Sequence, residues 1–232
     1  MTPLDFMQRR HVPLGLVIFD CDGVIVDSEP ISNRVTVTEL ASLGWTMTPA
    51  ESERRFLGMT FSDMVPVIEH RLGHPIPPAW HDTVKARLIE ALSREAIPIA
   101  GALEALAGLS ALRMPWRIAS NSSHEEMAAK FSRIGIASIV AGRLHSHRDV
   151  KQGKPAPDLF LAAAAAEGVV PAACVVIEDS QPGVRAAAAA GMDCLGYAPH
   201  SDGAALRALG AVPFRSMFDV PALVAAARRE TA

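Results

Sequence analysis

Short, continuous runs of apolar residues recur along the chain, and stretches with helical character separate them. An uninterrupted apolar run of this kind is typical of a strand that is covered on both faces. We expect strands at Leu16–Phe19, Trp116–Ala119, Ile139–Ala141, Cys174–Ile177 and Asp193–Tyr197. We expect helices between them at Gly101–Leu112, Glu125–Ile134, Pro157–Gly168 and Pro182–Gly191. Strands that alternate with helices are joined by right-handed crossovers, so the pattern predicts a Rossmann-like α/β fold with a doubly wound parallel sheet.

One long interval breaks this alternation. From Asp27 to about Ile99 the sequence shows helical patterns interrupted by glycine and proline, without a convincing strand. About 70 residues are too many for a crossover loop and enough for a small helical bundle. We therefore predict an α-helical cap domain at 28–99, inserted into a core domain formed by 1–27 and 100–232. The alternative is that these helices simply pack on the sheet. Residues Phe218–Arg229 are expected to form a surface helix.

The composition is that of an ordinary soluble globular protein. The chain has 232 residues, of which 50% are hydrophobic and 20% are charged, and its net charge is −3. This balance gives no reason to expect a nucleic acid or an anionic membrane as partner. No stretch approaches the roughly 18 uninterrupted apolar residues of a membrane helix, and the segment from Met1 to Pro13 lacks the apolar region of a signal peptide. We expect a cytoplasmic protein with free, buried thiols at Cys21 and Cys174.

Two acidic residues follow the first predicted strand directly. Asp20 and Asp22 flank one residue, and Gly23 lets the chain turn sharply after them. Ligands of open α/β sheets collect beyond the carboxyl ends of such strands, where Mg²⁺ is the usual cation beside phosphate. A covalent mechanism needs one acid as nucleophile and a second acid to move protons. Taken alone, the pair fits this chemistry and the capping of a turn about equally.

The predicted strand at 116–119 passes through a hydroxyl residue directly into the start of a helix. Ser120 and Asn121 would offer a hydroxyl and an amide there, beside the free backbone N–H groups of the helix. Two pairs in this turn have the spacing of a capping box, Ser122 with Glu125 and Ser123 with Glu126. Capping alone accounts for these pairs but not for Ser120, so the turn indicates a phosphate-binding site.

A lysine stands between two rigid positions further along the chain. Pro155 and Pro157 fix the backbone around Lys154, and the second proline suits the first turn of a helix. A rigidly held cation stabilises the charge of a phosphoryl group during transfer. Taken by itself, a single lysine in a loop is more often solvated.

A second pair of acids follows the predicted strand at 174–177. Glu178 and Asp179 lie at its end, and a proline and a glycine then open the next helix. Capping of that helix accounts for Asp179 but not for both acids. Together with the acids after the first strand, this pair would form an oxygen-rich cation site.

In this order, the four segments resemble the haloacid dehalogenase-like hydrolase superfamily. The match runs from about Leu14 to Ala198. The segments FDCDGVIVDSEP, GKPAPD and IEDSQPGV resemble the phosphatase and phosphohexomutase branch, which has a helical cap. The start of the predicted cap, residues 27–34, is similar to the 6-phosphogluconate phosphatase-like group. Each motif alone is weak or moderate, and their order and spacing make the resemblance strong.

The resemblance implies a role for each motif residue. Asp20 would attack phosphorus and become an aspartyl-phosphate, and Asp22 would protonate the leaving oxygen and later deprotonate water. Ser120 and Lys154 would hold phosphoryl oxygens. The substrate-binding set would comprise Ser120, Asn121 and Lys154, with Arg34 and Thr60 reaching the substrate from the cap. For Arg34, a solvated helix face is the more frequent interpretation.

The resemblance also implies Mg²⁺ as cofactor. Its ligands would be Asp20, the backbone carbonyl of Asp22 and Asp179, with Glu178 helping directly or through water. Mg²⁺ and Lys154 would offset the repulsion between an anionic nucleophile and an anionic substrate.

We therefore expect a Mg²⁺-dependent phosphatase of a small phosphorylated metabolite, a sugar phosphate or a sugar-acid phosphate, that acts as a monomer or homodimer. Asp22 argues against dehalogenation, because dehalogenases of the superfamily lack an acid there. The main alternative is a phosphohexomutase of the β-phosphoglucomutase type, although Ser32 and Phe61 stand where those proteins carry a cap histidine and a cap arginine. Two further alternatives are a phosphonate hydrolase, for which Lys85 is the sole lysine of the predicted cap, and a non-catalytic protein that binds a phosphorylated ligand.

Overall fold

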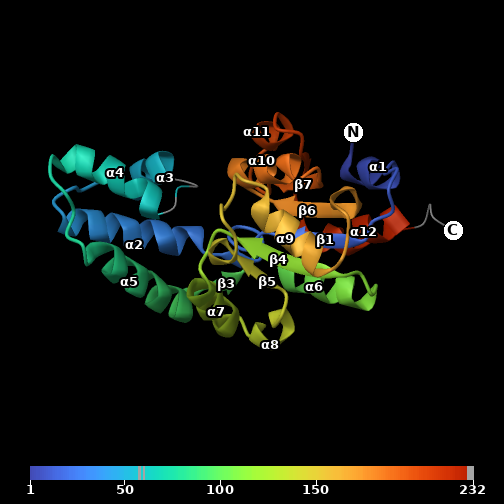
Figure 1. The fold of residues 1–232 in the computed structure, drawn as a ribbon, viewed down its shortest axis with the longest axis horizontal. Helices are drawn as coiled ribbons and strands as arrows, with labels where there is room; N and C mark the ends of the chain where they lie inside the picture. Colours follow the sequence, from blue (N-terminus) through green and yellow to red (C-terminus); the bar gives the residue numbers. More distant parts are fainter. Residues whose placement is uncertain (57–58, 60, 229–232) are drawn as a thin grey trace.

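Six parallel strands form the central sheet in the computed structural model, which describes residues 1–56, 59 and 61–228 (Figure 1). The strands are β1 (Leu16–Phe19), β4 (Trp116–Ser120), β5 (Leu144–Ser146), β6 (Cys174–Glu178), β7 (Asp193–Tyr197) and β8 (Val212–Phe214). Their order is β5-β4-β1-β6-β7-β8, and each pair of neighbours runs parallel. The predicted α/β fold with a doubly wound parallel sheet is confirmed.

Helices cover both faces of the sheet. They are α1 (Pro3–Gln8), α6 (Ala102–Ala111), α7 (His124–Arg133), α8 (Ala137–Val140), α9 (Asp158–Ala166), α10 (Gln181–Ala189), α11 (Ala204–Arg207) and α12 (Val220–Arg228), with short 3-10 turns η1 (His147–Asp149), η2 (Pro171–Ala173) and η3 (Met217–Asp219). Val17 and Phe19 of β1 pack in one hydrophobic cluster with α6, α7 and α12, whereas Leu16 and Ile18 pack in another with α9 and α10. All four side chains are fully buried, which explains the continuous apolar run. The predicted helices between the strands are confirmed within a few residues as α6, α7, α9 and α10.

Two strand assignments in the central sheet differ from the sequence prediction, and the short strands β2 (Val26–Asp27) and β3 (Ile97–Pro98) beside it are not predicted either. The predicted strand at 139–141 is wrong, because residues Ala137–Val140 form α8 and β5 lies further along the chain. Val140 is buried whereas Ile139 is 51% exposed, so one side of this short apolar run is covered, as in an amphipathic helical turn. The sequence pattern does not predict β8, which has Pro213 at its centre. Proline is tolerated there because β8 is an edge strand.

Within the described residues, four helices lie to one side of the sheet (Figure 1, left). They are α2 (Glu29–Ser42), α3 (Pro49–Phe56), α4 (Phe61–Leu72) and α5 (Trp80–Glu95). Fully buried apolar side chains such as Leu40, Ile68 and Val84 pack between them. The two connections to the sheet pair as an antiparallel ribbon of β2 (Val26–Asp27) and β3 (Ile97–Pro98). The division into a cap domain at 28–99 and a separate core domain stays a prediction.

Helix α5 also packs against α7, the helix that follows β4. The Nζ atom of Lys85 lies 3.3 Å from Oε2 of Glu125, and Nε of Arg133 donates to the carbonyl of Arg94 at 2.7 Å. In this structure α5 therefore connects the predicted cap to α7, one of the helices that cover the sheet.

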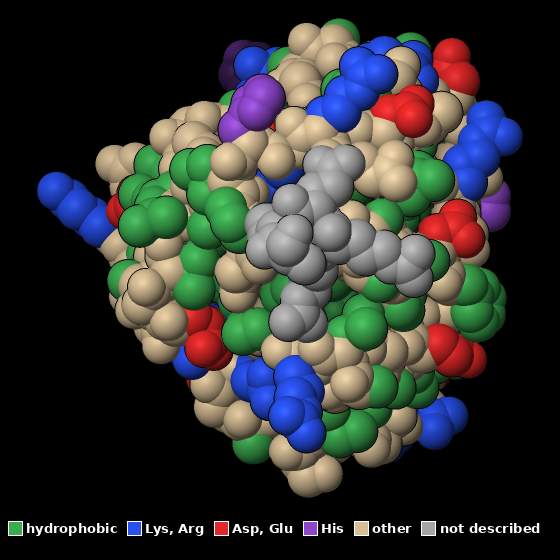
Figure 2. Space-filling view, turned by 90° about the vertical axis from the view of Figure 1, so that its right-hand side faces the viewer, with side chains coloured by type: hydrophobic (Ala, Val, Ile, Leu, Met, Phe, Trp, Pro, Cys, Tyr) green, Lys and Arg blue, Asp and Glu red, His purple; other side chains and the backbone are tan. Residues whose placement is uncertain are grey.

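The distribution of surface charge and the state of the cysteines agree with the expectations from the sequence. Figure 2 shows the end of the molecule away from α2–α5, where basic, acidic and apolar side chains of the described residues are interspersed. In the described ranges, none of the helices is both long enough and apolar enough to cross a membrane. Cys21 and Cys174 are buried and free, as predicted, and so is Cys194.

Candidate active site

The carboxyl ends of β1, β4 and β6 lie side by side, because β4 and β6 are the two neighbours of β1 in the sheet. Asp20 directly follows β1, while Ser120 and Glu178 are the last residues of β4 and β6. The sheet extends from β1 in opposite directions through these two strands, which creates the switch point where open α/β sheets bind ligands. The topology therefore brings together motif residues that are far apart in the sequence.

Lys154 stands between two of these acids. Its ammonium group donates to Oδ1 of Asp20 at 2.5 Å and to Oε1 of Glu178 at 2.8 Å, and it lies 4.8 Å from the centre of the Phe160 ring. Both Lys154 and Glu178 are buried. Burial alone would lower the pKa of Lys154, but the two carboxylates outweigh it and raise the pKa above its ordinary value. Lys154 is therefore a permanent cation at the site.

Asp20 and Asp179 are acids whose negative charges are poorly compensated. Burial raises the pKa of Asp20 to about 7, the charges of Glu178 and Asp22 add to this, and Lys154 offsets part of it. Burial likewise raises the pKa of Asp179, together with the charges of Glu178 and Asp20. A divalent cation beside both carboxylates would relieve this repulsion.

Asp20, Glu178 and Asp179 have the arrangement of a cation site. One carboxylate oxygen from each residue lies within 4.8 Å of the others. Gly23 leaves the room for Asp179, since its φ is +72° and a Cβ atom there would overlap the Asp179 carboxylate. Carboxylate oxygens are the ligands that Mg²⁺ takes in proteins, so the donor set fits the predicted cofactor.

The Glu178 carboxylate is already hydrogen-bonded within the protein. Its Oε1 accepts from Lys154, and its Oε2 accepts from the backbone N–H and the hydroxyl of Ser180 at 2.7 and 2.9 Å. Gly183 is required beside it, because a Cβ atom at that position would overlap the carboxylate. Both carboxylate oxygens of Glu178 therefore accept hydrogen bonds from the protein, and its binding to the cation, directly or through water, stays a prediction.

Asp22 is surrounded by hydrogen-bond donors from three segments of the chain. Nζ of Lys130 donates to its Oδ1 at 2.5 Å, and the Ser28 hydroxyl donates to the same oxygen. The hydroxyls of Ser122 and Ser120 donate to its Oδ2 at 2.8 and 3.2 Å. Burial opposes the charged form of Asp22, but Lys130 and the hydroxyl donors outweigh it and lower the pKa of Asp22 to about 2. The Asp22 carboxyl is therefore ionised in this arrangement.

The serine hydroxyls at the end of β4 and in the turn after it either cap α7 or contact Asp22. Ser123 forms a capping box with Glu126 at the start of α7, which decides between the two predicted pairs. Ser120, which is 1% exposed, and Ser122 instead direct their hydroxyls to Asp22. Ser120 thus lies at the acid cluster, and its role in phosphoryl binding stays a prediction.

Asn121 supports the lysine loop. Its Oδ1 accepts from the backbone N–H of Lys154 at 2.9 Å, and its Nδ2 donates to the Lys154 carbonyl at 3.0 Å. The sequence predicts Asn121 as a substrate-binding residue. Because the Lys154 backbone engages both ends of its amide, Asn121 holds the lysine loop in place in this structure, and substrate binding by Asn121 stays a prediction.

Comparison with known proteins places the sequence in one enzyme family. The sequence profile of the haloacid dehalogenase-like hydrolases matches residues 14–191. The chain belongs to this family. It is 31% identical over 191 residues to the 6-phosphogluconate phosphatase of Escherichia coli (strain K12), across 80% of this chain and 84% of that protein. It is 30% identical over 203 residues to the phosphorylated carbohydrates phosphatase of Thermotoga maritima, across 84% of this chain and 91% of that protein.

A solved structure of a haloacid dehalogenase-like hydrolase shares the fold of this chain. The protein from Deinococcus radiodurans R1, which has bound phosphate and sodium, superposes with a TM-score of 0.76 at 33% identity. The superposition covers 93% of this chain and 97% of that one. The likeness therefore extends over the helices of the predicted cap as well as the sheet.

In this haloacid dehalogenase-like hydrolase, three residues that contact Asp22 are not among the predicted site residues. They are Lys130, Ser28 and Ser122, and the sequence pattern predicts the last only as a possible helix cap. A signal for Lys130 is present in the sequence, because it lies on the buried face of α7 with Met127 and Phe131. A lysine at such a position is rare unless it is paired. Ser28 lies in the linker before α2 and carries no comparable signal.

The predicted substrate-binding residues of the cap have different outcomes. Arg34 is exposed, and its guanidinium donates to Oε2 of Glu95 at 2.6 Å. Thr60 lies outside the described residues. Substrate binding by Arg34 and Thr60 stays a prediction.

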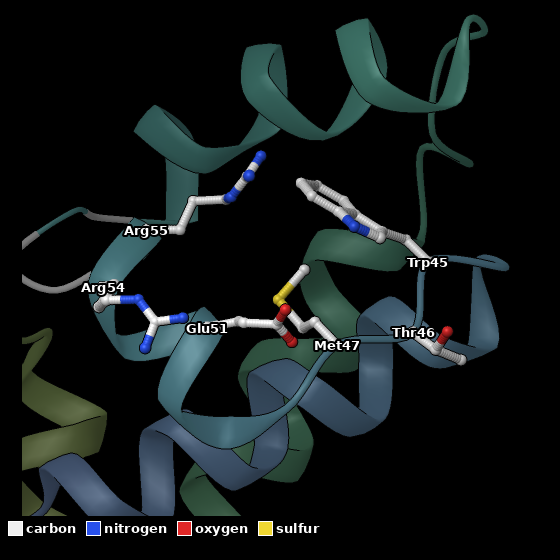
Figure 3. Close-up of a pocket in the computed structure, with 6 residues that line it drawn as sticks. All are labelled: Trp45, Thr46, Met47, Glu51, Arg54 and Arg55. Atoms are coloured by element: carbon white, nitrogen blue, oxygen red, sulfur yellow. The ribbon is translucent and has the colours of Figure 1, made fainter.

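A pocket of about 380 Å³ lies among the helices of the predicted cap (Figure 3). Its lining residues are Trp45, Thr46, Met47, Glu51, Arg54 and Arg55. The guanidinium of Arg55 lies 5.2 Å from the centre of the Trp45 ring, and Figure 3 shows the two side chains directed toward each other across the pocket. The lining shares no residue with the acid cluster, so the catalytic proposal below does not use this pocket.

Proposed function

We propose that this chain is a Mg²⁺-dependent phosphatase that hydrolyses the phosphate ester of a small sugar or sugar acid through an aspartyl-phosphate on Asp20. One observation carries the proposal. The nucleophile, the acid–base group and the phosphoryl-binding groups of the family motifs converge at adjacent strand ends; they are Asp20, Asp22, Ser120 and Lys154. The names of the similar proteins support the reaction class.

The first half of the reaction transfers the phosphoryl group to the protein. A carboxylate oxygen of Asp20 attacks phosphorus, and the bond between phosphorus and the ester oxygen breaks. Lys154 would place its charge beside the phosphoryl oxygens, and the Ser120 hydroxyl would donate to one of them. Asp22, once protonated, would give its proton to the departing alkoxide. The anionic phosphoryl group favours that protonation, because it draws the hydroxyl donors away and repels a second negative charge.

The second half of the reaction restores the protein. Asp22 takes a proton from water, whose oxygen attacks the phosphorus of the aspartyl-phosphate. The bond between phosphorus and Asp20 breaks, inorganic phosphate leaves, and the Asp20 carboxylate is regenerated. The ionised Asp22 of this structure is the form that this step requires.

The cation would be held by Asp20, Asp179 and the backbone carbonyl of Asp22, with Glu178 behind them. When bound, Mg²⁺ supplies positive charge that offsets the repulsion between the nucleophile and the substrate. Among the described residues the cluster contains four carboxylates and two ammonium groups, so a divalent cation would balance its charge.

A phosphohexomutase is not favoured. Ser32 and Phe61 replace the cap histidine and cap arginine of β-phosphoglucomutase-like proteins. Without those groups, the chain lacks side chains that would hold a sugar bisphosphate while the phosphoryl group returns to it. The choice of a sugar or sugar acid follows from the substrates named for the two similar phosphatases.

Phosphate release from a substrate panel tests the proposal. The panel contains sugar phosphates, sugar-acid phosphates and sugar bisphosphates, each with Mg²⁺ and with EDTA. We expect release in Mg²⁺ that EDTA abolishes. β-Glucose 1-phosphate is included, and formation of glucose 6-phosphate is followed in parallel. Conversion between these two without phosphate release would replace the phosphatase by a mutase, and no release from any panel member would contradict the proposal.

A further inference from the structure

Lys130 is a buried cation outside the family motifs. It is 1% exposed, on the same face of α7 as Met127 and Phe131. A buried lysine costs folding free energy unless its ammonium group is paired. Its hydrogen-bond acceptors are Oδ1 of Asp22 at 2.5 Å and Oγ of Ser122 at 2.8 Å. Since Ser122 itself donates to Asp22, both contacts serve the same carboxylate.

We propose that Lys130 is a positioning residue that holds the Asp22 carboxylate in the orientation needed to move protons to and from the substrate. The inference rests on the proposed function, because it concerns the step in which Asp22 acts as acid and base. The inference gives a role to Lys130, which lies outside the four family motifs of this chain.

The two oxygens of Asp22 are held in different ways. Oδ1 accepts from the Lys130 ammonium and from Ser28. Within the described part of the chain, the donors to Oδ2 are the hydroxyls of Ser120 and Ser122. A hydroxyl can rotate toward a phosphoryl oxygen, whereas the buried ammonium is fixed by the packing of α7. Oδ1 is therefore the anchored oxygen, and Oδ2 is the oxygen left to exchange a proton.

Access to the carboxylate agrees with this division. The Asp22 side chain is 32% exposed, while the Lys130 side chain is 1% exposed. Lys130 thus approaches Asp22 from the protein interior and leaves the outer side of the carboxylate open. The Asp22 carboxylate can therefore contact a substrate on its exposed side while it keeps its hydrogen bond to Lys130.

Helix α7 provides a firm base for the ammonium group. Its first turn is closed by the Ser123–Glu126 capping box, and its last turn is tied to α5 by the hydrogen bond from Arg133 to Arg94. Such restraints at both ends limit the movement of the residues between them. The position of α7 therefore fixes where the Lys130 ammonium group lies.

A purely structural lysine would make the same contacts but have a different kinetic effect. If Lys130 acted as a counter-ion alone, its loss would weaken turnover of all phosphate esters alike. If it positions an acid, its loss should matter most where the leaving group needs a proton. The dependence on the leaving group therefore separates the two roles.

The experiment is a double-mutant cycle of Lys130→Met and Asp22→Asn. The kcat/KM is measured with Mg²⁺ for the best sugar phosphate of the panel and for p-nitrophenyl phosphate, whose nitrophenolate leaves without a proton. We expect Lys130→Met to lower kcat/KM by about 10- to 100-fold for the sugar phosphate and by less than about threefold for p-nitrophenyl phosphate. Added to Asp22→Asn, it should have no further effect on either substrate.

Thermal unfolding without Mg²⁺ accompanies the cycle. Lys130→Met leaves a carboxylate without its cation and should lower the unfolding midpoint, and Asp22→Asn in the same chain should restore much of that loss. If Lys130→Met does not fold, Lys130→Gln replaces it in the cycle. Lys151→Met is the matched control, because Lys151 is exposed in a loop and should leave both kcat/KM values unchanged.

The outcomes separate the inference from the proposed function. Equal losses for the two substrates, or a further loss when Lys130→Met is added to Asp22→Asn, would overturn the positioning role while the phosphatase stands. Wild-type kcat/KM for the sugar phosphate in Asp22→Asn would overturn the acid–base role of Asp22, and the inference with it.

Discussion

Asp20→Asn should abolish turnover and lower kcat by about 10⁴-fold or more, as expected when a catalytic nucleophile is removed. An amide does not form the aspartyl-phosphate, so the first half of the reaction has no path. The side chain keeps its shape, and Lys154 keeps its contact with Glu178. The fold should persist, because the change removes a negative charge that burial already disfavours. Steady-state phosphate release and a thermal unfolding scan of the same preparation measure both effects.

A matched variant separates the loss of the nucleophile from a general effect of an Asp-to-Asn substitution. Asp82 lies on α5 with a side chain that is 90% exposed, so Asp82→Asn should keep the wild-type kcat. If a folded Asp20→Asn variant turned over at close to the wild-type rate, Asp20 would be ruled out as the nucleophile.

Lys154→Met should lower both activity and stability. We expect a loss of about 10²- to 10³-fold in kcat, because a preorganised positive charge no longer faces the phosphoryl group. We expect a fall of about 3–5 kcal/mol in the free energy of unfolding, because Asp20 and Glu178 lose the cation that they share. Urea unfolding and steady-state kinetics check the two effects separately.

The stability loss in Lys154→Met should depend on pH. Burial already raises the pKa of Asp20 to about 7 in the folded protein, and removal of the lysine raises it further. A carboxyl group with a raised folded-state pKa favours folding below its unfolded pKa and loses that contribution as the pH rises through the folded value. The difference from wild type should therefore be small near about pH 4 and largest above about pH 7. A difference that does not change with pH would contradict this account of the Lys154 contacts.

The sequence predicts most of the sheet, and the positions of the motif residues at strand ends, because both depend on local signals. The apolar run of Leu16–Phe19 requires burial on both faces, and the β1 strand has the same bounds. Parallel strands end at one edge of the sheet, so residues at the ends of the predicted strands are expected to lie close together. The structure places Asp20, Ser120 and Glu178 in this way.

The parts that the sequence does not predict depend on contacts between distant segments. Asn121 has the residue type of a ligand-binding amide, and in this structure it contacts the backbone of Lys154 in another loop. Lys130 contacts Asp22 across more than a hundred residues of sequence. No local spacing encodes either contact. The Asn121 contact forms only when β4 and the loop after β5 come together, and the Lys130 contact forms only when α7 packs beside the segment after β1.

Chemical trapping of the phosphoryl group tests the central claim most directly. Asp22→Asn is mixed with p-nitrophenyl phosphate and Mg²⁺, because this substrate needs no proton to form the aspartyl-phosphate and the variant lacks the base that breaks it down. The reaction is quenched and reduced with borohydride, which converts a phosphorylated aspartate to homoserine, and the peptides are mapped by mass spectrometry. We expect the aspartate-to-homoserine conversion at Asp20, dependent on both substrate and Mg²⁺. Conversion at another aspartate, or at none while nitrophenol is released, would contradict covalent catalysis by Asp20.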